Sequence, residues 1–151
     1  ENEASHALVH RSLIAARLKD SKSLSDALVK LMNHKIRYDS LMTNHDYDRG
    51  SCYCTDFAIG YLGIINEALV YSHDDDIELL PALPTSGFEN GTLKGIKTRN
   101  RTTVTELKWS NSGKKISAVI TSDIDQKLNV SAKGKTQKAT FKAGESKTII
   151  F

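Results

Sequence analysis

The stretch GSCYCTDFAIG, residues 50–60, gathers residue types that could do chemistry. It holds both cysteines of the chain, Cys52 and Cys54, with Tyr53 between them and Asp56 two residues later. A disulfide between cysteines that are separated by one residue would close a very short, strained ring. The alternatives that this stretch raises are therefore a metal clip, two ordinary thiols, a helix start or part of an active site.

A metal clip is the weaker of these alternatives. A lone C-x-C motif lacks the second ligand pair of a structural zinc site, and His45 and His73 stand at no spacing that is typical of one. His6 and His10 are four residues apart on an expected helix, but a third ligand is missing. The pattern favours two small apolar thiols, and we predict neither a metal nor another cofactor.

Asp56 allows two interpretations. It follows Thr55 at the start of an apolar run, where free amide groups and the helix dipole favour a carboxylate for structural reasons alone. The same dipole keeps a carboxylate ionised, which suits a base or a water-orienting group in a pocket. The residues by themselves leave both interpretations open.

The first half of the chain has helical periodicity. Apolar residues recur at helical spacing in residues 4–18 and again in 23–36, where Ser23 looks like an N-cap with Asp26 as its acidic partner three residues later. A polar, aperiodic loop follows in residues 39–54, and long loops of this kind are often functional.

A third helix is expected from Thr55 to the polar stop SHDDD. Its expected core-facing residues are Ile59, Leu62, Ile65 and Leu69. Because the helix is apolar nearly all round, we predict that it is buried, with Gly60 and Gly63 allowing close packing.

The second half of the chain has strand periodicity. Six short segments, most of them alternating apolar and polar residues, are separated by turn signals such as NSGK and KGKT. These segments are residues 92–99, 102–109, 114–122, 127–132, 137–142 and 147–151. The expected fold class is α+β, with a helical part followed by an antiparallel β-sandwich or open barrel.

The charge distribution also divides the chain. Residues 1–76 hold 8 Lys and Arg against 12 Asp and Glu, a net charge of −4, whereas residues 77–151 hold 13 against 6, a net charge of +7. The lysines of the second half are scattered along alternating segments, so we expect a solvated β surface and no nucleic-acid partner. No apolar run is long enough for a membrane span.

The start of the sequence shows neither an initiator methionine nor a signal peptide. We therefore expect a piece of a longer or processed protein. The sequence leaves its compartment open, with a secreted or a cytoplasmic bacterial protein as the two interpretations.

The run NEALVYSHDDDIELLPALPTSGFENGTLKGIKTR, residues 66–99, resembles the C-terminal part of family-95 glycoside hydrolases, the inverting α-L-fucosidases. The matching pieces are an inner helix ending in YSH, the segment IELLPALP and the strand GTLKGIKTR, and the resemblance covers residues 4–110. It implies that residues 1–76 are the last helices of a catalytic (α/α)6 barrel, 77–84 a linker and 85–151 an accessory β-sandwich.

The resemblance also implies site residues. Counting back eleven residues from Glu67, which matches a helix glutamate of the family, places the family's active-site aspartate on Asp56. Tyr53 then matches an aromatic residue, and Tyr53 and His45 are the candidate substrate-binding residues. Phe57 and Ala58 depart from the family pattern, as does Gly50, so the exact sugar and its linkage stay open.

In the resemblance, Asp56 would polarise the attacking water of an inverting mechanism, while the general acid lies upstream of this chain. The parent protein would be an enzyme with an oligosaccharide substrate, and this chain alone would be inactive. Without the rest of the barrel, the apolar faces of these helices would be exposed, and we expect them to favour a dimer of this chain. The alternative is a non-catalytic carbohydrate-binding or interaction module, for which the second half offers few aromatic residues.

Overall fold

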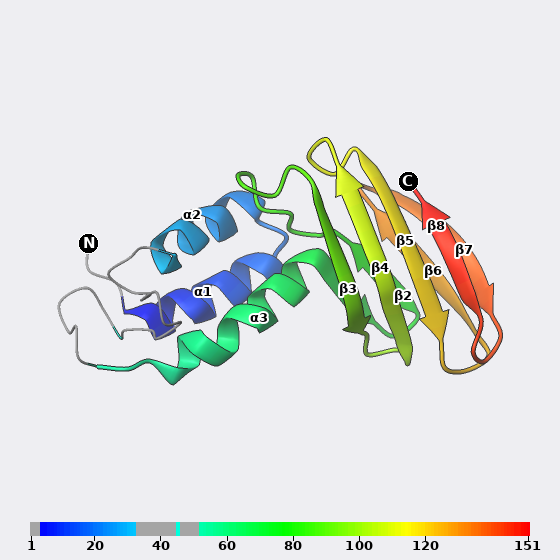
Figure 1. The fold of residues 1–151 in the computed structure, drawn as a ribbon, viewed down its shortest axis with the longest axis horizontal. Coiled ribbons are helices and arrows are strands. Elements are labelled where there is room, and N and C mark those ends of the chain that lie inside the picture. The colour runs from blue at the N-terminus through cyan, green and yellow to red at the C-terminus, as the bar shows by residue number, and fades with distance from the viewer. Residues whose placement is uncertain (1–3, 33–44, 46–51) are drawn as a thin grey trace. The chain divides into compact units, whose positions relative to one another are not determined.

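The computed structural model describes residues 4–32, 45 and 52–151. The chain divides into two compact units, residues 1–68 and 69–151, and each is taken by itself below (Figure 1). None of the helices in the described part of the chain has the length and apolarity that crossing a bilayer requires.

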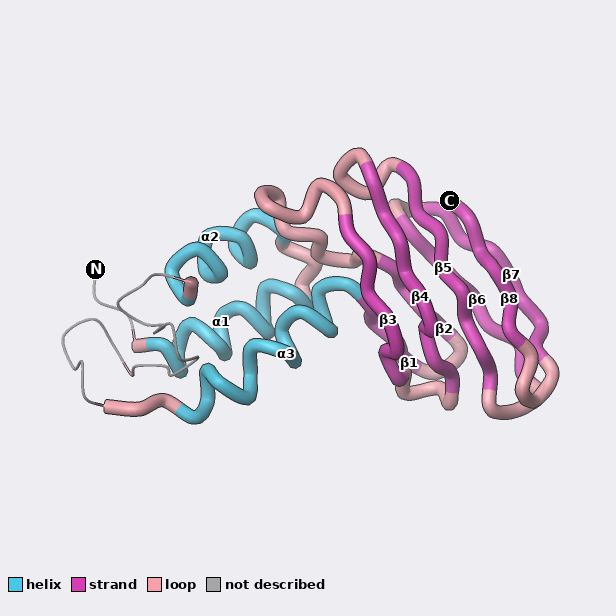
Figure 2. Tube along the Cα trace, in the orientation of Figure 1, coloured by secondary structure: helices cyan, strands magenta, loops and turns pink. Residues whose placement is uncertain are grey.

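The first unit is helical. Its helices are α1 (Ser5–Arg17), α2 (Ser21–Leu31) and α3 (Thr55–Leu69, whose last residue belongs to the second unit). Helices α1 and α2 form a hairpin joined by a short turn (Figure 2). The buried side chains of the three helices are mostly apolar and include Leu8, Leu24, Leu31, Phe57 and Ile64.

Helix α2 begins earlier than its sequence pattern predicted. The N-cap is Asp20, whose carboxylate accepts a hydrogen bond from the Ser23 amide at 3.0 Å. Ser23 is therefore the third residue of the helix, and its expected partner Asp26 pairs instead with Lys22 at 2.9 Å. Asp, Asn and Ser cap helices about equally well, so the sequence could not choose between the two starts.

Replacing Asp20 by Ala is expected to lower the melting temperature of the helical unit, because the Ser23 amide would lose its acceptor. Hydrogen bonds from the side chain and then the backbone of Ser23 lower the pKa of Asp20. A carboxyl whose pKa is lower in the folded state stabilises that state above its unfolded pKa, about 3.9 for Asp, and this contribution is lost as the pH falls through the folded value. The difference between mutant and wild type should thus be present at neutral pH and fade in acid.

Thermal unfolding followed by circular dichroism at 222 nm measures this difference. Asp26→Ala is the matched control, because it removes an exposed carboxylate from the same helix and leaves the cap in place. An equal effect of both variants at every pH would contradict the assignment of the cap.

The second unit is a β-sandwich of two four-stranded sheets. Its strands are β1 (Val70–His73), β2 (Asp76–Leu79), β3 (Gly91–Lys97), β4 (Thr102–Ser110), β5 (Lys115–Ser122), β6 (Gln126–Ala132), β7 (Lys135–Phe141) and β8 (Ser146–Ile150). One sheet has the order β1-β2-β6-β7 and the other β3-β4-β5-β8 (Figure 2). The six strands that the sequence predicted are β3 to β8, so the α+β class and the sandwich are confirmed.

The first sheet contains a parallel pair that the sequence did not predict. Strand β2 lies parallel to β6, with Ile77 opposite Val130 and Leu79 opposite Ala132. All other strand pairs are antiparallel. After β2 the chain leaves the first sheet, forms three strands of the second sheet and then returns as β6. The pairing of β2 with β6 therefore joins segments that are far apart in the sequence.

The sequence predicted a boundary between the helical half and the linker at residues 76 and 77, and the structure differs from this. The third helix ends at Leu69, and β1 begins directly at Val70. The segment IELLPALP, expected as a linker over 77–84, contributes Ile77 and Leu79 of β2 to the core, and Ala82 and Leu83 after it are also buried. The sequence pattern of this strand was short. Four residues beside two prolines fit an extended connection as well as they fit a strand.

Candidate functional site

Asp56 lies in the first turn of α3, as the sequence predicted, and its side chain is exposed. The buried Cys54 thiol is its neighbour, with Sγ 3.9 Å from Asp56 Oδ2. A carboxylate in this position gains from the unpaired amides and the dipole of the helix start. Its exposed side chain can still reach a water molecule or a ligand.

Tyr53 and His45 lie on the segments that lead into this helix. Tyr53 is 52% exposed. The His45 amide donates to the Cys52 carbonyl at 2.7 Å, and its carbonyl accepts from the Ser5 amide at 2.6 Å. The backbone of His45 is thus fixed both to the start of α1 and to the segment that carries Tyr53. The roles of Asp56, Tyr53 and His45 remain predictions.

The structure places a further histidine at this end of the helical unit. The His6 ring lies 4.9 Å from the His45 ring, at 40° to it. Local periodicity gave no sign of this contact, because the two residues are far apart in the sequence. In the described part of the chain no three His, Cys, Asp or Glu side chains are grouped to hold a metal ion.

The two cysteines have different surroundings. Both are free thiols, Cys54 buried and Cys52 exposed. The interpretation as a buried apolar thiol is therefore correct for Cys54 and wrong for Cys52. In an extended segment successive residues point to opposite sides, but residues 52 and 53 are both exposed, so burial before α3 does not follow this alternation.

Helix α3 is held on α1 by an ion pair. The Arg17 guanidinium donates to both carboxylate oxygens of Glu67, from Nε at 2.6 Å and from Nη2 at 3.0 Å. A bidentate pair fixes direction as well as distance. Glu67 thus has a positioning role near the end of α3. Fifty residues separate the partners, so sequence spacing could not show the pair.

The packing face of α3 agrees only in part with the expected one: of the expected core-facing residues, Leu69 is buried, whereas Ile59 and Leu62 are exposed. Phe57, Ile64 and Ala68 are buried, whereas Ile59 is 77% and Leu62 is 69% exposed. The helix is apolar on both faces, so periodicity could not tell which face meets α1. The predicted burial of the whole helix is wrong for the described residues, since one apolar face lies open.

Of the two glycines expected to allow close packing, only Gly60 does so. A Cβ added at Gly60 would lie 2.6 Å from Val9 Cγ1, whereas one added at Gly63 would meet nothing within 4 Å. Val9 is buried and has a stiff, β-branched side chain. Gly60 therefore permits the approach of α3 to α1.

We expect Gly60→Ala to destabilise the helical unit by about 1–3 kcal/mol, the usual cost of overpacking a core. Gly63→Ala on the same helix should instead stabilise it by about 0.5–1 kcal/mol, because Ala is the better helix former. Urea unfolding followed by helical circular dichroism measures both variants. Changes of the same sign in the two variants would contradict the packing of Val9 on Gly60.

A comparison with protein-family models relates part of the chain to a known family. Residues 71–150 match the family model described as "Glycoside hydrolase family 95, C-terminal domain". The matched range begins inside β1 and ends with β8, so it covers the strands of the β-sandwich and just over half of the chain. No curated protein matches the chain.

Proposed function

Since this chain belongs to glycoside hydrolase family 95, through the C-terminal domain of that family, we propose that it is the C-terminal portion of an inverting α-L-fucosidase-like enzyme. Its helical unit would be the last part of a catalytic (α/α)6 barrel, and its sandwich an accessory domain. The substrate of the parent enzyme would be an oligosaccharide with an α-L-fucosyl end.

The observation that carries this proposal is the open apolar face of the helix that runs into the family's domain. Ile59 and Leu62 of α3 are exposed, although a glycoside hydrolase helix with apolar residues on both faces is expected to pack on both. Ile14 of α1, Leu18 directly after α1, and Val29 of α2 are exposed as well. Stable monomers rarely leave such extended apolar surface open.

Further helices of a barrel would cover these faces. In the isolated chain the same faces would favour a dimer, because association is then the remaining way to remove Ile59, Leu62 and Leu18 from water. The sandwich offers a contrast: Ile150 is its one large exposed hydrophobic side chain among the described residues. The incomplete core thus belongs to the helical unit.

Asp56 would act on the base side of the reaction. An inverting enzyme protonates the leaving oxygen with one acid while a base activates water on the opposite face of the sugar, and the two carboxyl groups stand about 6.5–9.5 Å apart. Asp56, in the first turn of α3, would polarise that water directly or through an amide side chain. Tyr53 and His45 would contact the sugar.

The general acid would lie upstream of this chain. The 151-residue chain alone should therefore release no fucose. Measurable turnover by this chain would contradict this part of the proposal. A carbohydrate-binding module remains the alternative. It would bind oligosaccharides without hydrolysing them, in the isolated chain and in the parent protein alike.

The decisive experiment is an assay of the full-length parent protein on a 2-linked α-L-fucoside, followed by proton NMR. We expect fucose to be released first as the β anomer, because inversion changes the configuration at the anomeric carbon. Release of the α anomer first would contradict the mechanism. If the protein releases no fucose from fucosides but hydrolyses another glycoside, the proposed glycosidase activity stands and the proposed fucoside substrate is wrong.

A further inference from the structure

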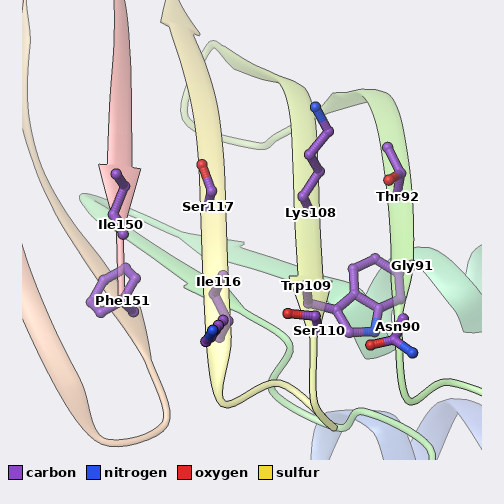
Figure 3. Close-up of a pocket in the computed structure, with 11 residues that line it drawn as sticks. Asn90, Gly91, Thr92, Lys108, Trp109, Ser110, Ile116, Ser117, Ile150 and Phe151 are labelled. Atoms are coloured by element: carbon purple, nitrogen blue, oxygen red, sulfur yellow. The ribbon is translucent and has the colours of Figure 1, made fainter.

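Two cavities adjoin at one end of the sandwich. The larger, about 600 Å³, crosses the strand ends of the β3-β4-β5-β8 sheet (Figure 3). The smaller, about 390 Å³, lies between the β4–β5 and β6–β7 turns, and the two share Ile116 and Phe151. The two turns lie close together: a Cβ built at Gly113 in the first turn would be 3.0 Å from Lys133 Cε in the second.

Lysines gather around these cavities. Those that line the larger cavity are Lys108 and Lys115, and those that line the smaller are Lys114, Lys133 and Lys135. Neither lining includes an Asp or Glu among the described residues. We refer to these five lysines as the lysine end. The strands bring them together from three separate stretches of the sequence, which is why the sequence suggested only a scattered basic surface.

The nearby acidic groups offset only part of this charge. Lys108 pairs with Glu106 at 2.6 Å, and the hydrogen bond from Lys108 lowers the pKa of Glu106 and keeps it ionised. Glu89 in the neighbouring loop accepts from the neutral Gly87 amide and so keeps its own negative charge. Other carboxylates of the sandwich, such as Asp125 and Glu145, lie in turns at the far ends of the strands. The lysine end therefore keeps an excess of positive charge.

Neutral hydrogen-bonding groups accompany the lysines. Asn90, Thr92, Ser110 and Ser117 line the larger cavity, and Figure 3 shows the Thr92, Lys108 and Ser117 side chains on neighbouring strands of one sheet. Amide and hydroxyl groups can pair with sugar hydroxyls as donors and acceptors. Ammonium groups bind carboxylate or sulfate oxygens by stronger, charge-assisted hydrogen bonds.

The aromatic residues offer little to ligands that bind by stacking: among the described residues the two linings hold only Trp109 and the half-buried Phe151. Trp109 is only 7% exposed, and its indole Nε1 is committed to the Phe88 carbonyl at 2.8 Å. Neutral sugars and single-stranded nucleic acids both rely on open aromatic faces, and for nucleic acids this stacking supplies much of the affinity. Charge and hydroxyl groups are what this surface offers.

We propose that the lysine end is a binding site for an anionic oligosaccharide that carries carboxylate or sulfate groups. The site belongs to the sandwich, whereas Asp56 belongs to the helical unit, and it would tether the enzyme to a charged glycan while the barrel acts on fucosyl ends. The carbohydrate class of this ligand rests on the proposed function. The anionic character rests on the five lysines alone.

Isothermal titration calorimetry of the 151-residue chain tests the proposal. The probes are an oligogalacturonate, which carries carboxylates, a sulfated galactan oligosaccharide and an uncharged malto-oligosaccharide. We expect binding of at least one charged probe, weakened by salt, and none of the uncharged one. The double variant Lys115→Glu/Lys135→Glu should weaken binding by roughly tenfold or more, as the loss of a charge-assisted hydrogen bond implies.

The matched control is Lys127→Glu/Lys138→Glu on β6 and β7, which changes the net charge equally and leaves both cavities untouched. Equal weakening in the two double variants would overturn the site in favour of diffuse charge attraction. Binding of neither charged probe would overturn it outright. Tighter binding of a single-stranded oligonucleotide would overturn the carbohydrate class.

Failure of this site and failure of the proposed function are distinguishable. In the parent protein, Asp56→Asn should leave glycan binding at the lysine end unchanged. The lysine double variant should in turn leave the hydrolysis of a small chromogenic fucoside unchanged. Loss of that hydrolysis in a folded lysine variant would show that the lysines serve the catalytic site, against the proposal.

Discussion

Asp56→Asn in the full-length parent enzyme is expected to lower kcat by about 10²–10⁴-fold, the range typical of a residue that takes part in general acid–base catalysis. The amide keeps the size of the carboxylate and can still accept a hydrogen bond, but it carries no negative charge with which to attract or accept a proton of the attacking water. Because Asp56 is an exposed residue of the first turn of α3, the change should leave the fold intact. Steady-state kinetics on a 2-linked fucoside measures the effect.

Asp26→Asn serves as the control. Asp26 is also an exposed aspartate on a helix of the same unit, and its ion pair with Lys22 lies on the surface, where such pairs contribute little. This variant should retain full activity. If Asp56→Asn retains it too, Asp56 has no part in the mechanism, and its position at the helix start has the purely structural explanation that its sequence context also allows.

Trp109→Ala is expected to give the largest loss of stability, about 3–5 kcal/mol, which is typical of removing a buried aromatic side chain. The indole is buried, it lies against Gly91 on the neighbouring strand, and it donates to the Phe88 carbonyl. A Cβ on Gly91 would lie within van der Waals overlap of the ring. Truncation leaves a cavity beside Gly91 and an unpaired carbonyl.

Urea unfolding of the chain, followed by far-ultraviolet circular dichroism and by hydrogen exchange of β4 amides, measures this loss. Fluorescence is unsuitable, because Trp109 is the only tryptophan of the chain. Ile150→Ala is the control: its side chain is exposed on β8, and surface substitutions usually stay within about 0.5 kcal/mol. A loss below about 1 kcal/mol for Trp109→Ala, on the scale of ordinary mutations, would mean that the indole does not hold β3 on β4.

The element types of this protein could be predicted from its sequence where one face of an element is apolar and the other polar. Strands β4 and β5 alternate strictly over most of their length, and their side chains are buried in that same alternation. Helix α2 carries Leu24, Leu28 and Leu31 on one stripe, and all three are buried. In these elements local pattern and tertiary packing agree.

Prediction failed where a local pattern was ambiguous. Helix α3 is apolar on both sides, so the choice of Phe57 and Ile64 as the packing face depended on Val9 and Gly60, which meet only in the tertiary structure. The cap of α2 required a choice between Asp20 and Ser23, two residue types with nearly equal capping strength. Both errors concern partners and not element types.

The sequence by itself determined the helical and strand halves, the opposite charges of the halves and the position of Asp56 at a helix start, because these follow from neighbouring residues. The tertiary structure decided the pairing of β2 with β6, the ion pair of Arg17 with Glu67 and the gathering of the lysine end. Each of these joins residues that are distant along the chain. Their contacts exist only after the chain has closed the loops between them, and no local spacing encodes that closure.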